Sequence, residues 1–279
     1  MSGGRLSIVA TPIGNLADAS ERMKTVLSAA DVVLAEDSRR TGRLLMQFGV
    51  EARLLALHEH NERDLVDELV RRLGEDEHLA LVSDAGTPAV SDPGFLLVRA
   101  AHAAGVRVET VPGPSAVIAA LSASGLPTDR FVFEGFLPAK AQARKTRLTA
   151  LSHEPRTMVF YEAVHRISDF LSDAGSVFGA DRMACVAREL TKRHEQIVTT
   201  TLAELCRQID TGQIVAKGEF VVLVAGAEVV EVTSAVDPEL LVRELLSAGI
   251  PVKAAAKAVS VATGAPRNKL YQFALDLQD

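Results

Sequence analysis

The first 125 residues alternate between short apolar runs and longer amphipathic segments, and this alternation constrains the fold more than any other feature. The runs have the length of buried strands, and the segments that follow them have helical periodicity. Strands are expected at residues 6–10, 31–35, 53–57, 79–82 and 106–109. Because a strand, a crossover helix and the next strand form a parallel pair, the sequence predicts a mainly parallel sheet with helices on its faces.

The stretch ALVSDAGTPAVSDPG at residues 80–94 continues the fourth strand into small, turn-forming residues. It ends in the acidic turn Asp92-Pro93-Gly94, before a helix expected at residues 95–104. Small residues let a ligand approach the backbone closely, and ligands of open α/β sheets bind at the carboxyl ends of the strands. An ordinary strand-to-helix loop has a similar composition, so both interpretations remain open.

The second half of the chain does not repeat the regular alternation of strands and helices. Strands are expected there at residues 131–135, 157–161, 183–187, 196–201 and 220–225. Fewer helices separate these strands, which predicts a mixed sheet in a second α/β domain. Three short helices are expected after residue 237, and they form a third unit. The predicted domains are therefore residues 1–126, 127–232 and 233–279, with a turn at residues 125–129 as the hinge between the first two.

Composition limits the compartment and the partners. No apolar run is long enough to span a bilayer, and the N-terminus lacks the layout of a signal peptide. Two cysteines, Cys185 and Cys206, make no disulfide framework or metal pattern and are expected to be buried thiols. We therefore expect a cytoplasmic protein with no membrane segment and no metal. The net charge of −6 argues against a globally basic nucleic-acid binder but allows local basic patches.

Two segments concentrate cations. Residues 139–153 carry Lys140, Arg144, Lys145 and Arg147 without an acid. Residues 245–275 also lack acids and carry four cations, on helices expected at 238–248, 252–263 and 266–277. The C-terminal unit is compatible with helix-turn-helix contact to nucleic acid. A dimerisation or packing appendage is the alternative.

Polar clusters at other strand ends have simple explanations. The cluster Glu36-Asp37-Ser38-Arg39-Arg40-Thr41 is read as a solvated loop, with a short helix only at residues 44–48. The cluster His58-Glu59-His60-Asn61-Glu62 lacks the spacing of a helical zinc site. Capping of the next helix by Asn61, with Glu62 in its first turn, explains this cluster better. The glycines near residue 14 match neither a Rossmann fingerprint nor a P-loop.

Eight motifs occur in order along the chain: ATPIGNL at residue 10, LAEDSRRT at 34, HEHNE at 58, VSDAGTPAVSDPG at 82, VPGPSAV at 111, GFLP at 135, VFYEAVHR at 159 and ARELTK at 187. Together they resemble the bacterial 16S ribosomal RNA cytidine 2′-O-ribose methyltransferases, a family of the tetrapyrrole methylase superfamily. The resemblance covers essentially the whole chain. It implies two α/β domains with S-adenosylmethionine in the cleft between them, a homodimer, and 16S rRNA in the small ribosomal subunit as the partner.

The resemblance also implies site residues. The implied cofactor contacts are Pro12, Ala85, Gly86, Thr87, Val90, Ser115, Ala116, Glu162 and Leu190, with the strand near Phe220 closing over the adenine. In other tetrapyrrole methylases the loop at residue 85 reads Gly-Gly-Asp-Pro. Ala85 and Thr87 depart from that pattern, so no aspartate contact is expected there.

A neutral ribose hydroxyl is a poor nucleophile, so a carboxylate is expected to help remove its proton. Asp37 is the candidate base, and Glu36 is its substitute and a substrate contact. Arg39 would hold a phosphate bidentately. Lys140, Arg144 and Lys145 would contact the RNA backbone, and Phe136 and Tyr161 are the few candidates for base stacking. A structural ion cluster at residues 36–39 is the alternative.

Two other functions compete with this one: methylation of a small tetrapyrrole, and a non-enzymatic RNA-binding assembly protein. A compact macrocycle needs neither the basic segment nor the helical tail, which argues against the first. A pure binding module has no reason to retain a methyl-donor cleft, so affinity for the cofactor would discriminate between the second and an enzyme.

Overall fold

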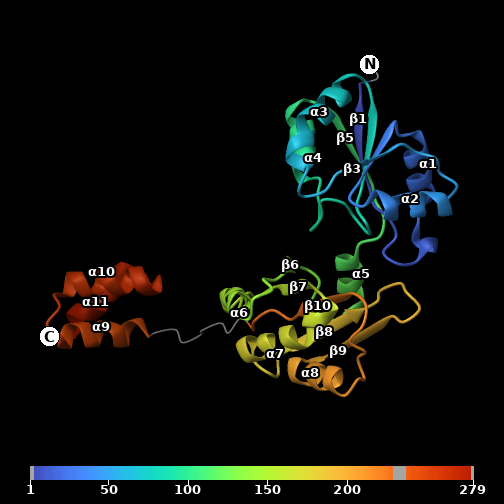
Figure 1. Cartoon of the computed structure of the whole chain (residues 1–279). Helices are drawn as coiled ribbons and strands as arrows, with labels where there is room; N and C mark the ends of the chain where they lie inside the picture. The colour runs from blue at the N-terminus through green and yellow to red at the C-terminus, as the bar shows by residue number, and fades with distance from the viewer. Residues whose placement is uncertain (1–2, 229–236, 278–279) are drawn as a thin grey trace. The chain divides into compact units, whose positions relative to one another are not determined.

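The N-terminal half forms the predicted parallel sheet in the computed structural model, which describes residues 3–228 and 237–277 (Figure 1). Its strands lie in the order β3-β2-β4-β1-β5, and every neighbouring pair is parallel. The strands are β1 Arg5–Val9, β2 Val32–Ala35, β3 Leu54–Ala56, β4 His78–Val82 and β5 Arg107–Val111. The prediction of five parallel strands is confirmed.

Helices cover both faces of this sheet because its central strands alternate their side chains. In β4, Leu79 and Leu81 join one core, while Ala80 and Val82 join the other. The first core is covered by α3 (Glu62–Gly74) and α4 (Phe95–Ala103). The second is covered by α1 (Glu21–Ala29) and α2 (Ser38–Gln47). A short 3₁₀ helix, η1 (Leu16–Asp18), precedes α1.

Two predictions about helix starts are wrong. Helix α2 begins at Ser38 rather than near residue 44, because the Asp37 carboxylate accepts hydrogen bonds from the backbone N–H groups of Arg39 and Arg40. The Asn61 side chain does not cap α3; it accepts a hydrogen bond from the His58 N–H.

Glu62 has a role beyond the first turn of α3. Its buried carboxylate accepts hydrogen bonds from the N–H groups of Gly94 and Leu97, each at 3.1 Å. Gly94 is the N-cap of α4 and has no side chain of its own to serve that end. A residue from the neighbouring helix therefore satisfies the start of the helix that follows the acidic turn.

The second sheet has the order β6-β7-β10-β8-β9, in which only β6 and β7 are parallel. Its strands are β6 Phe131–Phe136, β7 Thr157–Glu162, β8 Met183–Arg188, β9 Gln196–Thr201 and β10 Phe220–Val224. One face is covered by α6 (Ala141–Ala150), α7 (Ile167–Phe178) and α8 (Leu202–Asp210), and η2 (Val164–Arg166) precedes α7. The predicted mixed sheet is confirmed.

Helix α5 (Ala116–Ala123) covers the other face of the second sheet, where its Val117 and Leu121 pack with Val159 and Leu223. The sequence groups this helix with the first domain. The proposed division at residues 126 and 127 stays a prediction, but the apolar face of α5 lies on the second sheet.

The chain divides into two compact units, residues 1–227 and 228–279. The second unit consists of α9 (Pro238–Ser247), α10 (Val252–Thr263) and α11 (Arg267–Asp276) around a small core that includes Val242, Val259 and Leu270. The predicted boundary at residues 232 and 233 lies outside the described residues.

Two features are absent from residues 3–228 and 237–277: a membrane-spanning helix and a metal-binding cluster. No helix in these ranges is apolar over a length that would cross a bilayer. Nor do the same ranges contain three or more His, Cys, Asp or Glu side chains arranged to hold a metal ion. Both cysteines are free thiols; Cys185 is buried and Cys206 is partly exposed.

Candidate functional site

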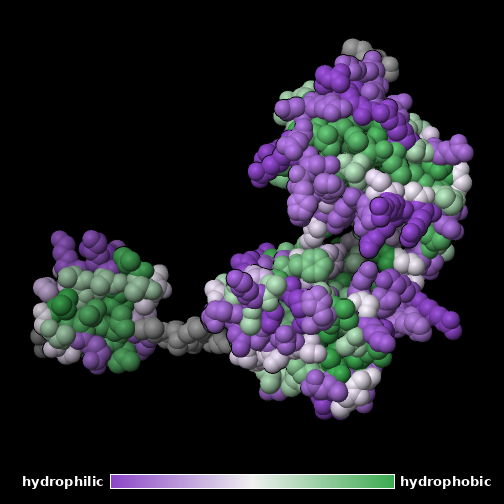
Figure 2. All heavy atoms as spheres, viewed as in Figure 1, coloured by the Kyte–Doolittle hydropathy of each residue, from purple (hydrophilic) through white to green (hydrophobic). Residues whose placement is uncertain are grey.

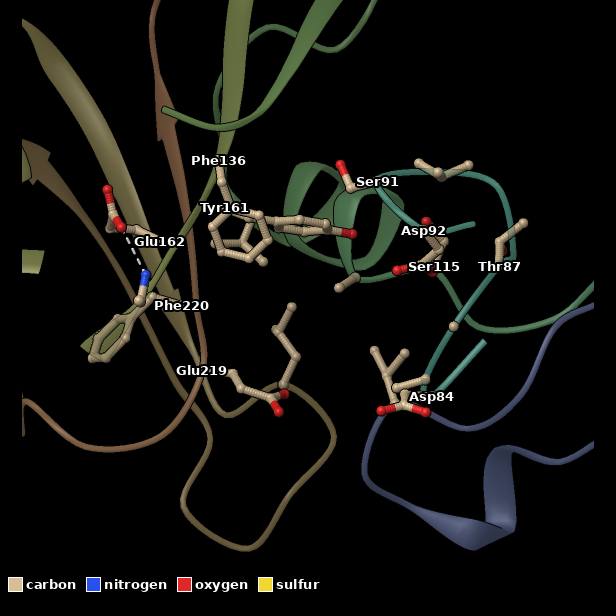
Figure 3. A pocket seen from close by; sticks show the side chains of 18 of the residues that line it. Asp84, Thr87, Ser91, Asp92, Ser115, Phe136, Tyr161, Glu162, Glu219 and Phe220 are labelled. Carbon is tan, nitrogen blue, oxygen red and sulfur yellow. Dashed lines mark hydrogen bonds between the residues drawn. The ribbon is translucent and has the colours of Figure 1, made fainter. Parts of the chain in front are cut away.

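A pocket of about 500 Å³ is lined by residues from both sheets (Figure 3). This volume lies within the usual range for small-molecule sites, about 300–1,000 Å³. The first sheet contributes the loops after β1, β2, β4 and β5, which all leave the carboxyl edge of the parallel strands. The second contributes residues of β6, β7, β8 and β10, the segments after β7 and β8, and Gly218 and Glu219 just before β10. The location agrees with the rule for open α/β sheets.

The loop after β4 is fixed against the loop after β1. Gly86 and Thr11 exchange two backbone hydrogen bonds of 2.9 and 3.0 Å. Gly86 has φ +84°, and a Cβ atom at this position would lie 3.3 Å from Ile13 Cγ2. A side chain here would therefore be strained and crowded, whereas glycine leaves the backbone open to the pocket.

Two further parts of the pocket wall contain strained backbone. Ala89 and Ser91 have φ of 65° and 62° and flank Val90, while Glu189 and Thr191 have φ of 51° and 64° and flank Leu190. A non-glycine residue in this region costs about 1–3 kcal/mol and persists where the surroundings impose it. Such strain clusters at ligand sites, and here it presents Val90 and Leu190 to one pocket.

The pocket is acidic. The charged residues that line it are the acids Glu36, Asp84, Asp92, Glu162 and Glu219 and the cation Arg40. Burial raises the pKa of Asp92 to about 6, with the neighbouring carboxylates adding to the effect. Burial and Asp84 raise the pKa of Glu36 as well. Carboxylates that are hard to ionise in one pocket favour a ligand with positive charge.

Three of these carboxylates are already paired. Asp84 accepts hydrogen bonds from the Asp37 N–H at 3.0 Å and from the Arg40 guanidinium at 2.9 Å. Glu219 pairs with Lys192, on the loop after β8, at 3.0 Å. The buried Glu162 carboxylate pairs with Arg166 at 3.1 Å, and Figure 3 shows it pointing away from Asp84 and Glu219. Glu36 and Asp92 are therefore the carboxylates best placed to meet a ligand.

An aromatic wall lies across the pocket from the loop after β4. The ring centroids of Phe136 and Tyr161 are 5.4 Å apart, and Phe133 meets Tyr161 edge-on at 5.0 Å. Phe136 is 58% exposed, which leaves a face free for a planar group. Burial and the charge of Asp92 raise the pKa of Tyr161 to about 12, so its hydroxyl stays neutral.

The structure brings together most of the residues predicted to bind a cofactor. All of them except Pro12 line the pocket: Ala85, Gly86, Thr87, Val90, Ser115, Ala116, Glu162 and Leu190. Pro12 lies in a neighbouring hollow, and Ile13 takes its expected place. Glu36 lines the pocket, but Asp37, Arg39, Lys140, Arg144 and Lys145 do not.

Asp37 is poorly suited to act as a base. Its carboxylate accepts the Arg39 N–H at 2.8 Å and the Arg40 N–H at 3.3 Å. These two backbone hydrogen bonds lower its pKa. A carboxylate that caps a helix and holds a proton weakly is less able to accept one, so the geometry favours Glu36 over Asp37.

The structure contradicts the predicted role of Arg144 in RNA contact. Arg144 is 2% exposed, and its Nη2 atom lies 2.7 Å from Asp173 Oδ2 on α7. Lys145 pairs with the same carboxylate at 3.2 Å but remains half exposed. Lys140, at the start of α6, is exposed. The sequence segment lacks acids, but α7 supplies the missing counter-charge.

Sequence reasoning missed several residues of the pocket, among them Ile13, Asp84, Asp92 and Glu219. A signal existed for Asp92, since its acidic turn closes the small-residue loop after β4. Glu219 had no comparable signal, because β10 brings it to the site from more than a hundred residues away.

Comparisons with known proteins agree with this architecture. The family described as Tetrapyrrole (Corrin/Porphyrin) Methylases matches residues 5–206, and the RsmI C-terminal HTH domain matches residues 234–278. The "Ribosomal RNA small subunit methyltransferase I" of Xylella fastidiosa is 54% identical over 268 residues, which cover 96% of this chain and 98% of that protein. The protein of the same name from Pseudomonas aeruginosa is 52% identical over 279 residues, covering 100% and 99%.

Among solved structures, uroporphyrin-III C-methyltransferase from Thermus thermophilus, complexed with S-adenyl homocysteine, superposes with a TM-score of 0.55. The match covers 80% of this chain and 97% of that chain at 18% identity. At this identity the likeness concerns the fold alone, and it confirms the predicted pair of α/β domains.

Proposed function

The chain belongs to the tetrapyrrole methylase family, and we propose that it transfers a methyl group from S-adenosylmethionine to the 2′-hydroxyl of a cytidine ribose in 16S ribosomal RNA. The curated relatives named above are methyltransferases of small-subunit ribosomal RNA and match this chain over almost its whole length. The observation that carries the proposal is the acidic pocket at the carboxyl edge of the first sheet, formed by the motifs that define the resemblance.

The pocket suits this methyl donor. S-adenosylmethionine supplies an electrophilic methyl group on a positively charged sulfonium, and it also carries an ammonium and a carboxylate. Asp92 would attract its positive charge, and Gly86 leaves backbone groups of the loop accessible. Val90, Leu190 and Phe220 supply apolar surface for adenine. Ser115 and Ala116, at the start of α5, line the pocket as well.

Glu36 would accept the proton of the ribose hydroxyl. It lines the pocket, and burial together with Asp84 raises its pKa towards the range where a carboxylate is an effective base. Asp37 would act as a positioning residue, because it caps α2 next to Glu36 and donates its own N–H to Asp84. Positioning of the reacting atoms supplies much of the acceleration in such displacements.

The RNA must present one nucleotide to this site. A ribose within a helix is hard to bring to a pocket, so the target would be single-stranded or splayed out. Phe136 and Tyr161 offer a wall on which its base can stack. Arg39, Lys140 and Lys145 are exposed or half exposed and would contact the backbone nearby. The enzyme would act on rRNA of the small subunit in the cytoplasm, as a homodimer.

Methyl transfer to isolated small ribosomal subunits, with a labelled methyl donor, tests this function. A 2′-O-methyl group blocks alkaline cleavage of the adjacent phosphodiester, so the label should appear in an alkali-resistant dinucleotide that contains cytidine. Gly86→Val should abolish labelling and binding of the donor in a folded protein. Label in a porphyrinoid instead of RNA, or no label with donor binding intact, would contradict the proposal.

A further inference from the structure

A second hollow of about 240 Å³ adjoins the pocket and shares Arg40 and Asp84 with it. Helix α2 forms most of its wall, and the loops after β1 and β4 complete it. The lining residues are Pro12, Arg40, Thr41, Arg43, Leu44, Gln47, Ser83 and Asp84. Its volume is below the range of about 300–1,000 Å³ for small-molecule sites. It therefore suits one segment of a longer ligand that also reaches the main pocket.

The hollow differs from the pocket in charge. Helix α2 has the sequence SRRTGRLLMQ, with three arginines and no acid. Arg40, Arg43 and Gln47 are spaced three and four residues apart and so share one face of the helix. Arg43 and Gln47 are exposed, and within residues 3–228 and 237–277 no carboxylate pairs with Arg43. Figure 2 shows hydrophilic side chains over α2 in this view.

The single acid that lines the hollow, Asp84, is already paired with a cation. Asp84 Oδ2 accepts a hydrogen bond from Arg40 Nη1 at 2.9 Å, and its Oδ1 accepts the Asp37 N–H at 3.0 Å. Arg40 is two-thirds exposed, so its remaining N–H groups are available. The carboxylate fixes Arg40 on the border of the two cavities, and the unpaired Arg43 gives the hollow a net positive charge.

We propose that this hollow binds the phosphodiester group next to the methylated nucleotide, with Arg40, Arg43 and Gln47 as its donors. The proposal rests on the proposed function, which requires an RNA backbone at the mouth of an acidic pocket. The pocket carboxylates repel a phosphate, so the phosphate must be held outside while its ribose enters. Guanidinium groups match phosphate oxygens in geometry and charge. In one nucleotide the 2′-hydroxyl and the 3′-phosphate are neighbours, as are Glu36 and Arg40, which line the same pocket.

Arg43 is the best probe because it lines the hollow but not the pocket. We compare Arg43→Ala and Arg43→Glu with wild type and with Arg63→Ala, which removes an exposed arginine from α3 on the other face of the first sheet. Calorimetry measures how tightly each protein binds S-adenosylmethionine. Methylation assays on small ribosomal subunits measure kcat and KM at several salt concentrations.

Arg43→Ala should raise KM for the RNA about tenfold and make its dependence on salt shallower by about 0.7–0.9 log units per tenfold in salt, the effect of one lost phosphate contact. Arg43→Glu should raise KM further. The affinity for S-adenosylmethionine, and kcat at saturating concentrations of subunits, should stay within about twofold of the wild-type values. Arg63→Ala should match wild type in every measurement.

Wild-type KM and salt dependence in both Arg43 variants would overturn the proposal while leaving the methyltransferase assignment intact. An equal loss in Arg63→Ala would also overturn it, since the effect would then reflect overall charge. Absence of RNA methylation by the wild-type protein would instead contradict the proposed function.

Discussion

Helices α2 and α6 resemble each other in sequence but differ in what their cations contact. Each carries three basic residues and no acid: Arg39, Arg40 and Arg43 in α2, and Arg144, Lys145 and Arg147 in α6. In α6 all three are paired, two with Asp173 on α7 and one with Glu134 on β6. In α2 only Arg40 pairs with a carboxylate among the described residues, and that carboxylate belongs to the pocket.

The difference shows that the charge of a segment does not reveal its task. The cations of α6 fasten that helix to its own domain, since the buried Arg144 guanidinium donates to Asp173 at 2.8 Å and to the Ala139 carbonyl at 3.3 Å. The cations of α2 lie beside an acidic cavity and remain available to an anion. Counter-charges from elsewhere in the fold decide which basic helix keeps cations available for an anion.

The largest effect is expected at Glu36, which lies between β2 and the Asp37 cap of α2. Glu36→Gln keeps the size of the side chain but removes the proton acceptor, so kcat should fall by about 10²–10⁴, the usual contribution of a positioned acid–base group. Donor affinity should change only a few-fold, because Asp92 keeps its charge. Single-turnover methylation of small subunits and calorimetry measure the two quantities. A kcat within threefold of wild type would rule out Glu36 as the base.

Substitution of Arg144 in α6 should lower the stability of the protein and leave its binding to RNA unchanged. Arg144→Met leaves the Asp173 carboxylate buried beside Lys145 alone, and breaking a buried ion pair costs about 3–5 kcal/mol. Thermal unfolding should show this loss. The double variant Arg144→Met/Asp173→Leu removes both charges and should recover most of the stability. Full stability with weakened RNA binding in Arg144→Met would restore the original prediction for Arg144 and erase the contrast with α2.

The carboxylates of the pocket predict that the affinity for the methyl donor depends on pH, whereas the arginines of α2 predict no such dependence. Burial raises the pKa of Asp92 to about 6, so the free protein holds this proton below pH 6. A cationic donor prefers the ionised carboxylate; its affinity should therefore be highest above pH 7 and fall by up to about tenfold per pH unit below 6. In the ligand-free protein the sign is opposite, because a raised carboxyl pKa adds stability as pH falls through 6.

Calorimetry from pH 5 to pH 8 tests this dependence. Asp92→Asn should bind the donor more weakly at pH 7 and lose the dependence near pH 6. Arg43→Ala should keep it unchanged, since Arg43 lies outside the pocket. An identical pH profile in wild type and Asp92→Asn would show that another group titrates.

The fold was predictable because its strands are short apolar runs and its parallel half repeats one local unit. The position of the pocket was predictable for the same reason, since parallel strands end at one edge and the glycine-containing loop after β4 lies there. The partner of Arg144 was not, because Asp173 is nearly thirty residues away and packing alone brings it close. The cap formed by Asp37 was also missed, because a cluster of charges in sequence resembles a solvated loop.

Asp37 gives the smallest and sharpest test, because it separates a capping carboxylate from a catalytic one. Asparagine is as good an N-cap as aspartate, so Asp37→Asn should keep α2 intact and methylate RNA at close to the wild-type rate. Asp37→Ala loses the cap and should lower the melting temperature by a few degrees. The helix hydrogen bonds lower the pKa of Asp37 in the folded protein. The stabilisation that depends on its charge is therefore fully present above the unfolded pKa near 4, and it is lost as pH falls from there through the lowered folded pKa. Melting curves at pH 7 and pH 3.5, beside single-turnover rates, measure both effects. A hundredfold slower rate in a stable Asp37→Asn protein would return the role of base to Asp37 and assign Glu36 to the pocket wall.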